Sequence, residues 1–264
     1  MIGLQHASIF VYFLTLVLIL PVFYFIKKAK KNKNLYVRRI AGIDAIDETI
    51  GRSVELGRPI FFSTGLTSIN PVLYACLGVL DNVAKKVATF KSQLFVPQND
   101  PEVLAIVEDT VRTAYHSVGR SSYYDPNNIQ YLSSEQFAYA AGYIGLVHRE
   151  NAGGVFLFGE FAAESLILAE AGQQVGAMQI GATTSPEQAA FFIVSCDYTL
   201  IGEELFSASA YLTRESVQLG SLYAQDRAKF AIMIIIILGI LLATIESFSP
   251  DLIPFDYRYF WNLI

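Results

Sequence analysis

Long apolar stretches lie near both ends of the chain, and most of the polar residues lie between them. Residues 8–26 contain no charged side chain over 19 positions, and residues 230–245 contain none over 16. A helix that crosses the hydrocarbon core of a bilayer needs roughly 20 apolar residues. The first stretch has this length, and the second reaches it when its flanks, from Ala228 to Phe248, are included. The pattern predicts a transmembrane helix at each end of the chain.

Short apolar runs alternate with segments of helical period in the region between these stretches. The expected strands are RPIFFST, LFVPQ, IQYLS, GGVFLFG, AMQIGAT and DYTLIG. Three of them are followed by Asn-Pro, Asp-Pro or Ser-Pro, which are typical helix starts. This pattern predicts an α/β fold: a Rossmann-like, mostly parallel sheet with helices on both faces, flanked by N- and C-terminal transmembrane helices.

Local signals predict several helix boundaries. The segments SSEQ (133–136) and SPEQ (185–188) have the spacing of capping boxes at the starts of two helices. A further helix is expected over residues 161–171, because a glycine follows it. Residues 203–230 are expected to be helical and could continue as one rod into the second apolar stretch.

The predicted segments differ in their relation to the membrane. They are an N-terminal transmembrane helix (1–27), a basic juxtamembrane segment with an amphipathic helix (28–57), a cytoplasmic α/β domain (58–213), a helix that runs into the second transmembrane segment (214–247) and an aromatic C-terminal tail (248–264). The aromatic side chains of the tail are expected at the membrane interface. A disordered end is the alternative for this segment.

The basic residues predict the orientation in the membrane. Seven of the 19 lysines and arginines follow the first apolar stretch, and Arg227 and Lys229 precede the second. Excess Lys and Arg beside a span marks the cytoplasmic side. We therefore expect a two-pass protein of the inner (plasma) membrane, in contact with the lipid bilayer, with both termini outside and the α/β domain in the cytoplasm. A cleaved signal peptide is disfavoured, because no basic residue precedes the first stretch and no small-residue cleavage site follows it.

Charge and cysteine content exclude several classes of partner. Residues 40–226 contain nine basic and 21 acidic side chains, and an acidic surface repels the phosphates of nucleic acids. Cys76 and Cys196 lie in apolar contexts on the side expected to be cytoplasmic, which favours buried thiols over a disulfide. The three histidines have no His or Cys partner at metal-ligand spacing. No metal site, cofactor or nucleic-acid partner is therefore expected.

Polar residues follow several expected strands, and ligands of open α/β sheets bind outside the carboxyl ends of the strands. The candidate ligand-binding residues are Ser63, Thr64, Gly65, Gly159, Glu160, Thr183 and Glu203. Free N–H groups at the helix start after STGLTS could hold an anion, and Glu160 with Glu203 could form a carboxylate pair. The structural alternative is that the hydroxyl residues cap and turn the chain while the glutamates interact with helix dipoles.

Sequence motifs of catalysis are missing. The sequence contains no G-x-G-x-x-G, no G-x-x-x-x-G-K-[ST] and no G-x-S-x-G nucleophile turn. Cys76 falls in the middle of an expected helix with no evident base. No catalytic residue is predicted, and the sequence favours a protein that is not an enzyme.

Five segments together resemble a bacterial membrane-protein family of unknown function. They are AIDETIGRSVELGRPIFFSTG, FAYAAGYIGL, GEFAAESLILAEAG, QIGATTSPEQAAFF and DYTLIGEELFSASAYL. The resemblance extends over residues 40–240. It implies an α/β domain between two transmembrane helices, and it supplies no catalytic residue.

Three functions are compatible with these features. The favoured one is a membrane-anchored scaffold or interaction subunit, homo-oligomeric or part of a larger membrane assembly. Two anchors would hold the domain over the bilayer, and small residues at 207–210 and Gly239 would allow close helix packing. The alternative is a sensor or enzyme that binds a small metabolite or nucleotide at the strand ends. A transport accessory subunit ranks third, because neither apolar stretch contains an ionisable residue of the kind found in transport paths.

Overall fold

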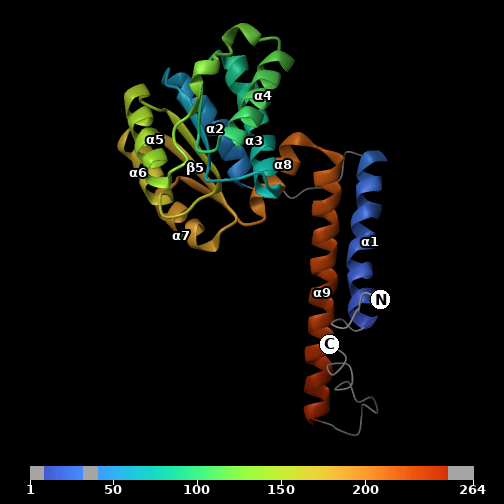
Figure 1. Cartoon of the computed structure of the whole chain (residues 1–264). Helices are drawn as coiled ribbons and strands as arrows, with labels where there is room; N and C mark the ends of the chain where they lie inside the picture. Colours follow the sequence, from blue (N-terminus) through green and yellow to red (C-terminus); the bar gives the residue numbers. More distant parts are fainter. Residues whose placement is uncertain (1–8, 32–40, 249–264) are drawn as a thin grey trace, which may run out of the picture. The chain divides into compact units, whose positions relative to one another are not determined.

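The chain divides into two compact units, and a computed structural model describes its residues 9–31 and 41–248. One unit contains α1 (Ile9–Lys31) and α9 (Ser216–Phe248), and the other contains the elements from α2 to α8 (Figure 1). The two apolar stretches of the sequence therefore belong to one unit, and the alternating region belongs to the other.

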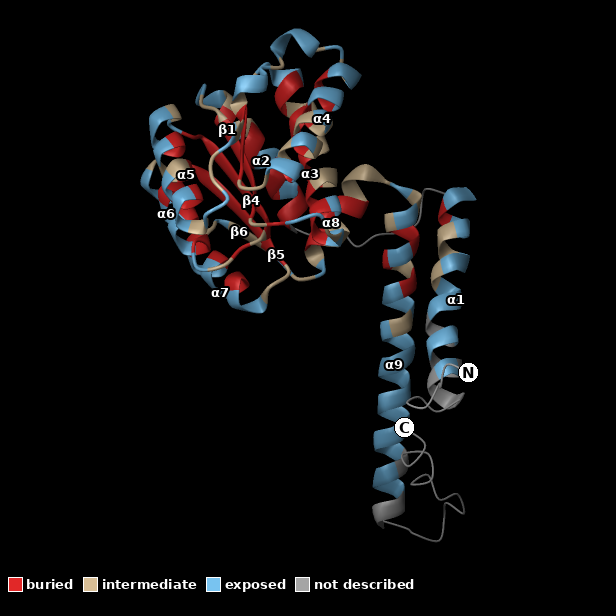
Figure 2. Ribbon diagram, in the orientation of Figure 1, coloured by how far each residue is buried: buried red, intermediate tan, exposed pale blue. Residues whose placement is uncertain are grey.

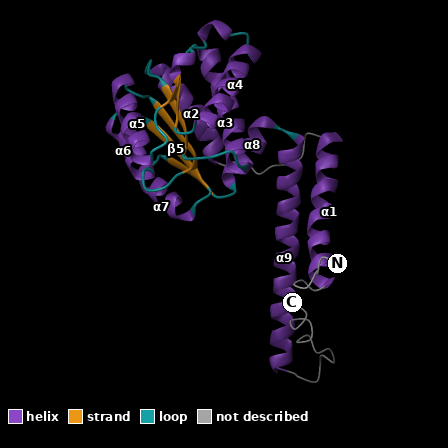
Figure 3. Cartoon of the chain, viewed as in Figure 1, coloured by secondary structure: helices purple, strands orange, loops and turns teal. Residues whose placement is uncertain are grey.

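The second unit is built on a six-stranded sheet in which all neighbouring strands are parallel. Its strands are β1 (Ile60–Gly65), β2 (Leu94–Gln98), β3 (Ile129–Tyr131), β4 (Gly154–Glu160), β5 (Met178–Thr183) and β6 (Tyr198–Ile201). Their spatial order is β3-β2-β1-β4-β5-β6, which is the order of the doubly wound dinucleotide-binding sheet. Figure 3 shows these strands between two layers of helices. The predicted α/β class with a parallel sheet is confirmed.

The helices of this unit follow the strands in regular alternation. They are α2 (Ala41–Glu55), α3 (Pro71–Phe90), α4 (Pro101–Ser117), α5 (Gln136–Glu150), α6 (Ser165–Gln174), α7 (Pro186–Ser195) and α8 (Glu204–Thr213), with short 3-10 turns at Ser121–Tyr123 and Pro126–Asn128. Asn70 caps α3 by accepting a hydrogen bond from the Leu73 N–H, and Asp100 caps α4 in the same way through Glu102. A proline occupies the first turn of both helices, so these two predicted helix starts are correct.

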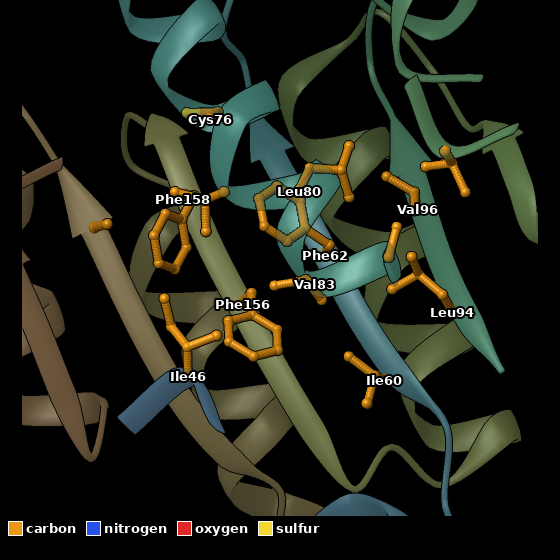
Figure 4. Packing of buried hydrophobic residues seen from close by; sticks show 14 of the residues in the cluster. Ile46, Ile60, Phe62, Cys76, Leu80, Val83, Leu94, Val96, Phe156 and Phe158 are labelled. Carbon is orange, nitrogen blue, oxygen red and sulfur yellow. The ribbon is translucent and has the colours of Figure 1, made fainter. Parts of the chain in front are cut away.

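The larger hydrophobic core lies on the face of the sheet that α2, α3, α4 and α8 cover. In Figure 4, Phe62 of β1 and Phe158 of β4 lie close to Leu80 and Val83 of α3. The Phe62 and Phe158 rings stack with centroids 5.6 Å apart. α3 has ten buried residues, so its apolar sequence is explained by burial within the unit.

A second core lies on the opposite face, under α5, α6 and α7. It receives Phe61 of β1 and Leu157 of β4, because successive residues of a strand point to opposite faces. Tyr143 of α5 packs edge-on against Phe61, and Phe161 packs edge-on against Phe192 of α7. Figure 2 shows the buried residues along the strands, between the two helical layers. With both faces covered, the strands are apolar along most of their length.

Two predicted helix starts, those of α5 and α6, are wrong, and side-chain hydrogen bonds explain them. The predicted start of α7, with Ser185 before the helix and Pro186 as its first residue, is correct. α6 begins at Ser165 rather than at residue 161, because the Glu164 carboxylate folds back to accept from the Ala162 N–H. Neither predicted capping box forms. Gln136 donates to Glu164 at 2.6 Å, and Gln188 accepts from Ser165 at 2.5 Å, so both glutamines bond to other elements.

The helix that could have continued from residue 203 as one rod into the second apolar stretch is interrupted. α8 ends at Thr213 and α9 begins at Ser216. Arg214 between them has φ = 53°, in the left-handed region that terminates helices. The two helices therefore belong to different units.

The first unit consists of two helices that pack side by side in opposite directions (Figure 1). The Phe25 and Tyr223 rings lie 5.0 Å apart, and Gly220 faces the backbone of Ile26. A Cβ atom at Gly220 would lie 2.5 Å from the Ile26 Cα, so this close approach requires glycine.

Within the described parts of the chain, one helix is long and apolar enough to cross a membrane. It spans Ser216–Ile245. The most apolar 18-residue window of this helix has a mean hydropathy of 2.7, and none of that window is buried. The N-terminal span stays a prediction, although α1 is a 23-residue helix. The predicted aromatic tail beyond residue 248, and Lys33, Arg38 and Arg39 of the basic segment, lie outside the described residues.

Candidate functional site at the carboxyl ends of the strands

The strand order reverses between β1 and β4, and doubly wound proteins bind ligands in the crevice at this switch point. β1 ends in Ser63, Thr64 and Gly65, and β4 ends in Gly159 and Glu160. These two strands are neighbours in the sheet, and their register shifts between Ser63 and Gly65. The structure therefore brings together five of the seven candidate residues.

Hydrogen bonds join the loop after β1 to the end of β4. The Leu66 N–H donates to the Glu160 carbonyl at 2.8 Å, and the Glu160 N–H donates to Thr67 Oγ1 at 2.7 Å. Thr67 Oγ1 in turn donates to the Thr64 carbonyl. The loop thus continues the pairing of the two strands across the position where a crevice would open.

The two glycines permit this contact. Gly65 has φ = 63° and Gly159 has φ = 149°, both in regions that favour glycine. A Cβ atom at Gly65 would lie 2.5 Å from the Glu160 carbonyl oxygen, and one at Gly159 would collide with the Thr64 carbonyl. The close contact between the ends of β1 and β4 requires glycine at both positions. Their presence is therefore explained by packing within the protein, and no ligand is needed to account for it.

The Glu160 carboxylate lies near the start of α3. Its Oε2 accepts from Asn70 Nδ2 at 2.9 Å, and Asn70 Oδ1 caps the helix by accepting from the Leu73 N–H at 3.0 Å. A negative charge near a helix N-terminus is stabilised by the helix dipole. The position at which an anionic ligand would be expected is therefore already served by a carboxylate of the protein itself.

The hydroxyl groups of β1 take part in buried pairs on opposite faces of the sheet. Ser63 Oγ lies 2.7 Å from the Tyr139 hydroxyl, which also donates to the Pro97 carbonyl at 3.4 Å. On the other face, Thr64 Oγ1 donates to Gln98 Oε1 at 2.7 Å. These bonds connect β1 with β2 and α5. Within the described residues, Gln98 Nε2 and the Tyr143 hydroxyl are buried without a hydrogen-bond partner.

A second polar group lies at the starts of α5, α6 and α7. The fully buried Glu164 accepts from Gln136 Nε2 of α5 and from the Ala162 N–H. Ser165 at the start of α6 donates to Gln188 of α7. These contacts hold the three helices of this layer together at their amino-terminal ends. Sequence reasoning missed Tyr139, Glu164 and Gln188, because each lies inside a segment with an ordinary helical pattern.

The two remaining candidates lie farther along the sheet. Thr183 ends β5, and its hydroxyl accepts from the Ser185 N–H at 3.3 Å, so it shapes the following turn. Glu203 follows β6, two strand positions from β4, which corresponds to on the order of 10 Å. The structure does not make Glu160 and Glu203 neighbours along the sheet edge, and this weakens the case for a carboxylate pair.

Burial holds the cysteine thiols and the tyrosine hydroxyls of the cores in their neutral forms. Burial raises the pKa of the Cys76 thiol, and nearby Glu160 raises it further. Burial also raises the pKa of Tyr139, and it raises the pKa of Cys196 to about 12. A thiol nucleophile needs a lowered pKa, so neither cysteine is activated. Both cysteines are free thiols, with Cys76 buried and Cys196 half-buried.

Two pockets of the α/β unit lie at the opposite edge of the sheet. They are open pockets of about 400 Å³ that border the amino ends of the strands: one lies beside Met178 and Asp197, and the other beside Pro59 and Gln93. The described residues contain no group of three or more His, Cys, Asp or Glu side chains that could hold a metal ion. The strand ends at the switch point form a hydrogen-bonded polar layer.

The fold and this layer define a class of protein: a doubly wound α/β unit combined with a unit of two long helices. A family model described as a domain of unknown function, DUF6754, matches residues 3–253, so the chain belongs to this family. No curated protein and no solved structure matches the chain. The expected membership of a family of unknown function is confirmed.

Proposed function

We propose that the protein is a membrane-anchored scaffold or interaction subunit that presents its α/β unit in the cytoplasm as part of a homo-oligomeric or larger membrane assembly. The observation that carries this proposal is the surface of α9. The large apolar side chains that the structure describes between Phe230 and Ile245 are each between 41% and 67% exposed. Water cannot solvate so continuous an apolar surface favourably, so lipid or another protein must cover it.

α1 is proposed as the second anchor because it runs beside α9. Its residues Tyr12, Leu16, Ile19 and Leu20 are about half exposed, like those of the partner helix. The contact at Gly220 places the first turns of α9 beside the last turns of α1. Lys27, Lys28, Lys30 and Lys31 lie at this shared end on α1, and Arg227 and Lys229 lie about three turns into α9, just before its uncharged stretch. The positive-inside rule then favours a cytoplasmic position for this end.

The strand ends favour presentation of a surface over ligand turnover. The switch-point loop is hydrogen-bonded to β4, and Glu160 lies at the start of α3. A small-metabolite or nucleotide sensor remains the second candidate, because the strand order is that of nucleotide-binding sheets. The sensor rests on the fold alone, and a fold does not define a function. We therefore rank the scaffold above the sensor.

Flotation of vesicles that contain the full chain tests the two anchors. Paired substitutions Leu16→Arg with Leu20→Arg in α1, and Ile235→Arg with Leu238→Arg in α9, each add a cost of about 5–7 kcal/mol to insertion. We expect either pair alone to leave the chain membrane-bound, and both pairs together to release it. The matched control places two arginines at Ala105 and Thr113, which are exposed on α4, and should float like the wild type. Release of the wild type from the vesicles by alkaline washing would contradict the proposal of two anchors. Release of a variant that carries only one of the two substituted pairs would contradict it as well.

Thermal unfolding with a panel of nucleotides tests the second candidate. The scaffold predicts no change in Tm with any nucleotide. A rise of several degrees with one nucleotide, abolished by Thr64→Val, would favour the sensor.

A further inference from the structure

The outer surfaces of the two helical layers differ in chemistry. α2 and α4 present mainly charged residues to solvent, including Asp44, Asp47, Glu102, Asp109 and Arg112. The layer of α5, α6 and α7 instead exposes six large apolar side chains. They are Phe137, Leu166, Ile167, Phe191, Ile193 and Val194, and we call them the apolar face.

Side-chain hydrogen bonds join the helices that carry the apolar face. Phe137, Leu166 and Ile167 lie in the first turns of α5 and α6, whereas Phe191, Ile193 and Val194 lie in the second half of α7. Gln136 bonds to Glu164, which joins the start of α5 to the start of α6, and Ser165 bonds to Gln188, which joins α6 to α7. Val194 is 82% exposed and Phe137 is 62% exposed. At about 150 Å² for a large apolar side chain, the exposed fractions of the six residues add up to on the order of 500 Å². This sum is more than half of the about 800 Å² that each partner contributes to a stable interface.

We propose that the apolar face is a self-association surface, and that its occupant is the α7 helix of a second copy of this chain, packed antiparallel across a two-fold axis. The inference rests on the proposed function and names the surface through which the assembly forms.

The spacing of residues on α7 fits this arrangement. Glu187, Ala190, Phe191 and Val194 follow one another at helical intervals on the solvent side. Ala190 and Phe191 lie in the middle, so a two-fold axis there would place Phe191 of one copy against the small Ala190 of the other. In such an isologous contact, the same surface patch of both copies forms the interface.

Charge complementarity supports the antiparallel direction. Glu187 lies one turn before the centre and Val194 one turn after it, so each Glu187 would lie over the Val194 end of the other helix. That end borders the pocket that Arg52 of α2 lines together with Val194 and Ser195. Asp197 also lines this pocket, but its carboxylate accepts a hydrogen bond from the Gln179 N–H at 2.7 Å. Arg52 is exposed and would face Glu187 of the second copy.

A lipid surface fits the apolar face less well. Helices that lie on anionic membranes carry Lys or Arg on their polar side, whereas α6 and α7 contain no basic residue and contain Glu170 and Glu187. Anchoring in a membrane would confine the copies to two dimensions and raise their effective concentration, so a modest face would suffice.

Two exposed alanines provide a matched test in the detergent-solubilised full chain. Ala190→Asp on α7 should lower the measured mass from that of the dimer, or raise the dimer Kd at least tenfold, whereas Ala105→Asp on α4 should change neither. Since both alanines are exposed, both variants should fold. An unchanged mass with Ala190→Asp would overturn the proposal.

A charge exchange tests the pairing itself. Glu187→Arg alone and Arg52→Glu alone should each weaken the dimer several-fold, and the double variant should restore it, because the opposite charges again face each other. Failure of the double variant to recover would overturn the antiparallel arrangement.

Cysteine crosslinking distinguishes failure of this surface from failure of the proposed function. In a Cys196→Ser background, Ala190→Cys should form an intermolecular disulfide in vesicles, and Ala105→Cys should not. If the wild type is oligomeric but Ala190→Cys does not crosslink, the assembly uses another surface and the inference alone is wrong. If the wild type is a monomer in the membrane, the inference and the homo-oligomeric scaffold both fail.

Discussion

The helices α3 and α9 are both long and apolar, yet they lie in opposite environments. In α3, Val79, Leu80 and Val83 are fully buried between the sheet and its neighbouring helices. In α9, Ile235 is 67% exposed and no residue of the apolar window is buried. The chain fully buries the sheet-facing side of α3, but it leaves each described large apolar side chain between Phe230 and Ile245 of α9 at least 41% exposed. The same composition therefore serves folding in one helix and points to an external apolar environment for the other.

The same chemical change in each helix gives the largest expected difference. Leu80→Ala should destabilise the α/β unit by about 2–5 kcal/mol, because it removes a buried side chain and leaves a cavity. Leu238→Ala should leave the stability of that unit unchanged, because Leu238 is half exposed and belongs to the other unit. The alkylation rate of the fully buried Cys76 in urea reports the unfolding free energy in both variants. Equal effects would show that the two helices do not differ as described.

A smaller effect is expected from the buried thiols as the pH rises. The unfolded chain loses thiol protons above about pH 8.5, while the folded chain retains them because burial raises the pKa of Cys76 and raises that of Cys196 to about 12. The contribution of the thiols to the free energy of unfolding is therefore fully present below pH 8.5. Above this pH the free energy of unfolding falls, by about 1–2 kcal/mol for each thiol between pH 8.5 and 10.

Urea unfolding followed by circular dichroism at several pH values measures this slope. In Cys196→Ser, the free energy of unfolding should fall less steeply with pH, because only one thiol still contributes. A stability that is constant from pH 8 to 10 in the wild type would contradict the burial of both thiols.

The smallest effect concerns the start of α3, which the protein itself supplies with a negative charge. Glu160→Gln should destabilise the α/β unit by about 0.3–1 kcal/mol, because the favourable interaction with the helix dipole is lost while the side-chain oxygen can still accept from Asn70. The Cys76 alkylation assay measures this change. A gain in stability would argue that the Glu160 carboxylate is held there for another purpose, such as binding a cation.

Much of the fold could be predicted because its signals are local. Asn70-Pro71 and Asp100-Pro101 begin α3 and α4 as expected, since a cap and a proline act within one turn. Ser185-Pro186 likewise begins α7. The starts of α5 and α6 could not be predicted in the same way. Gln136 bonds to Glu164, and Gln188 bonds to Ser165, so neither glutamine completes a capping box at its own helix start, and no local pattern indicates such partners.

The candidate site shows the same limit. Residues at strand ends could be named, and five of them do meet, because parallel strands end at one edge of the sheet. Their role could not be inferred, since Gly65 and Gly159 also fit a turn that approaches a ligand. Only the short distances between Gly65 and Glu160, and between Gly159 and Thr64, show that these glycines serve contacts inside the protein.

The accessibility of two engineered cysteines tests most directly the claim that α9 crosses a bilayer. Ser249→Cys lies just after α9, and Thr113→Cys lies on the exposed side of α4, each introduced in a Cys196→Ser background. In intact cells, a membrane-impermeant thiol reagent should label Ser249→Cys, and it should label Thr113→Cys only after permeabilisation. Labelling of both cysteines only after permeabilisation, or of both before it, would place them on the same side and contradict a membrane-spanning α9.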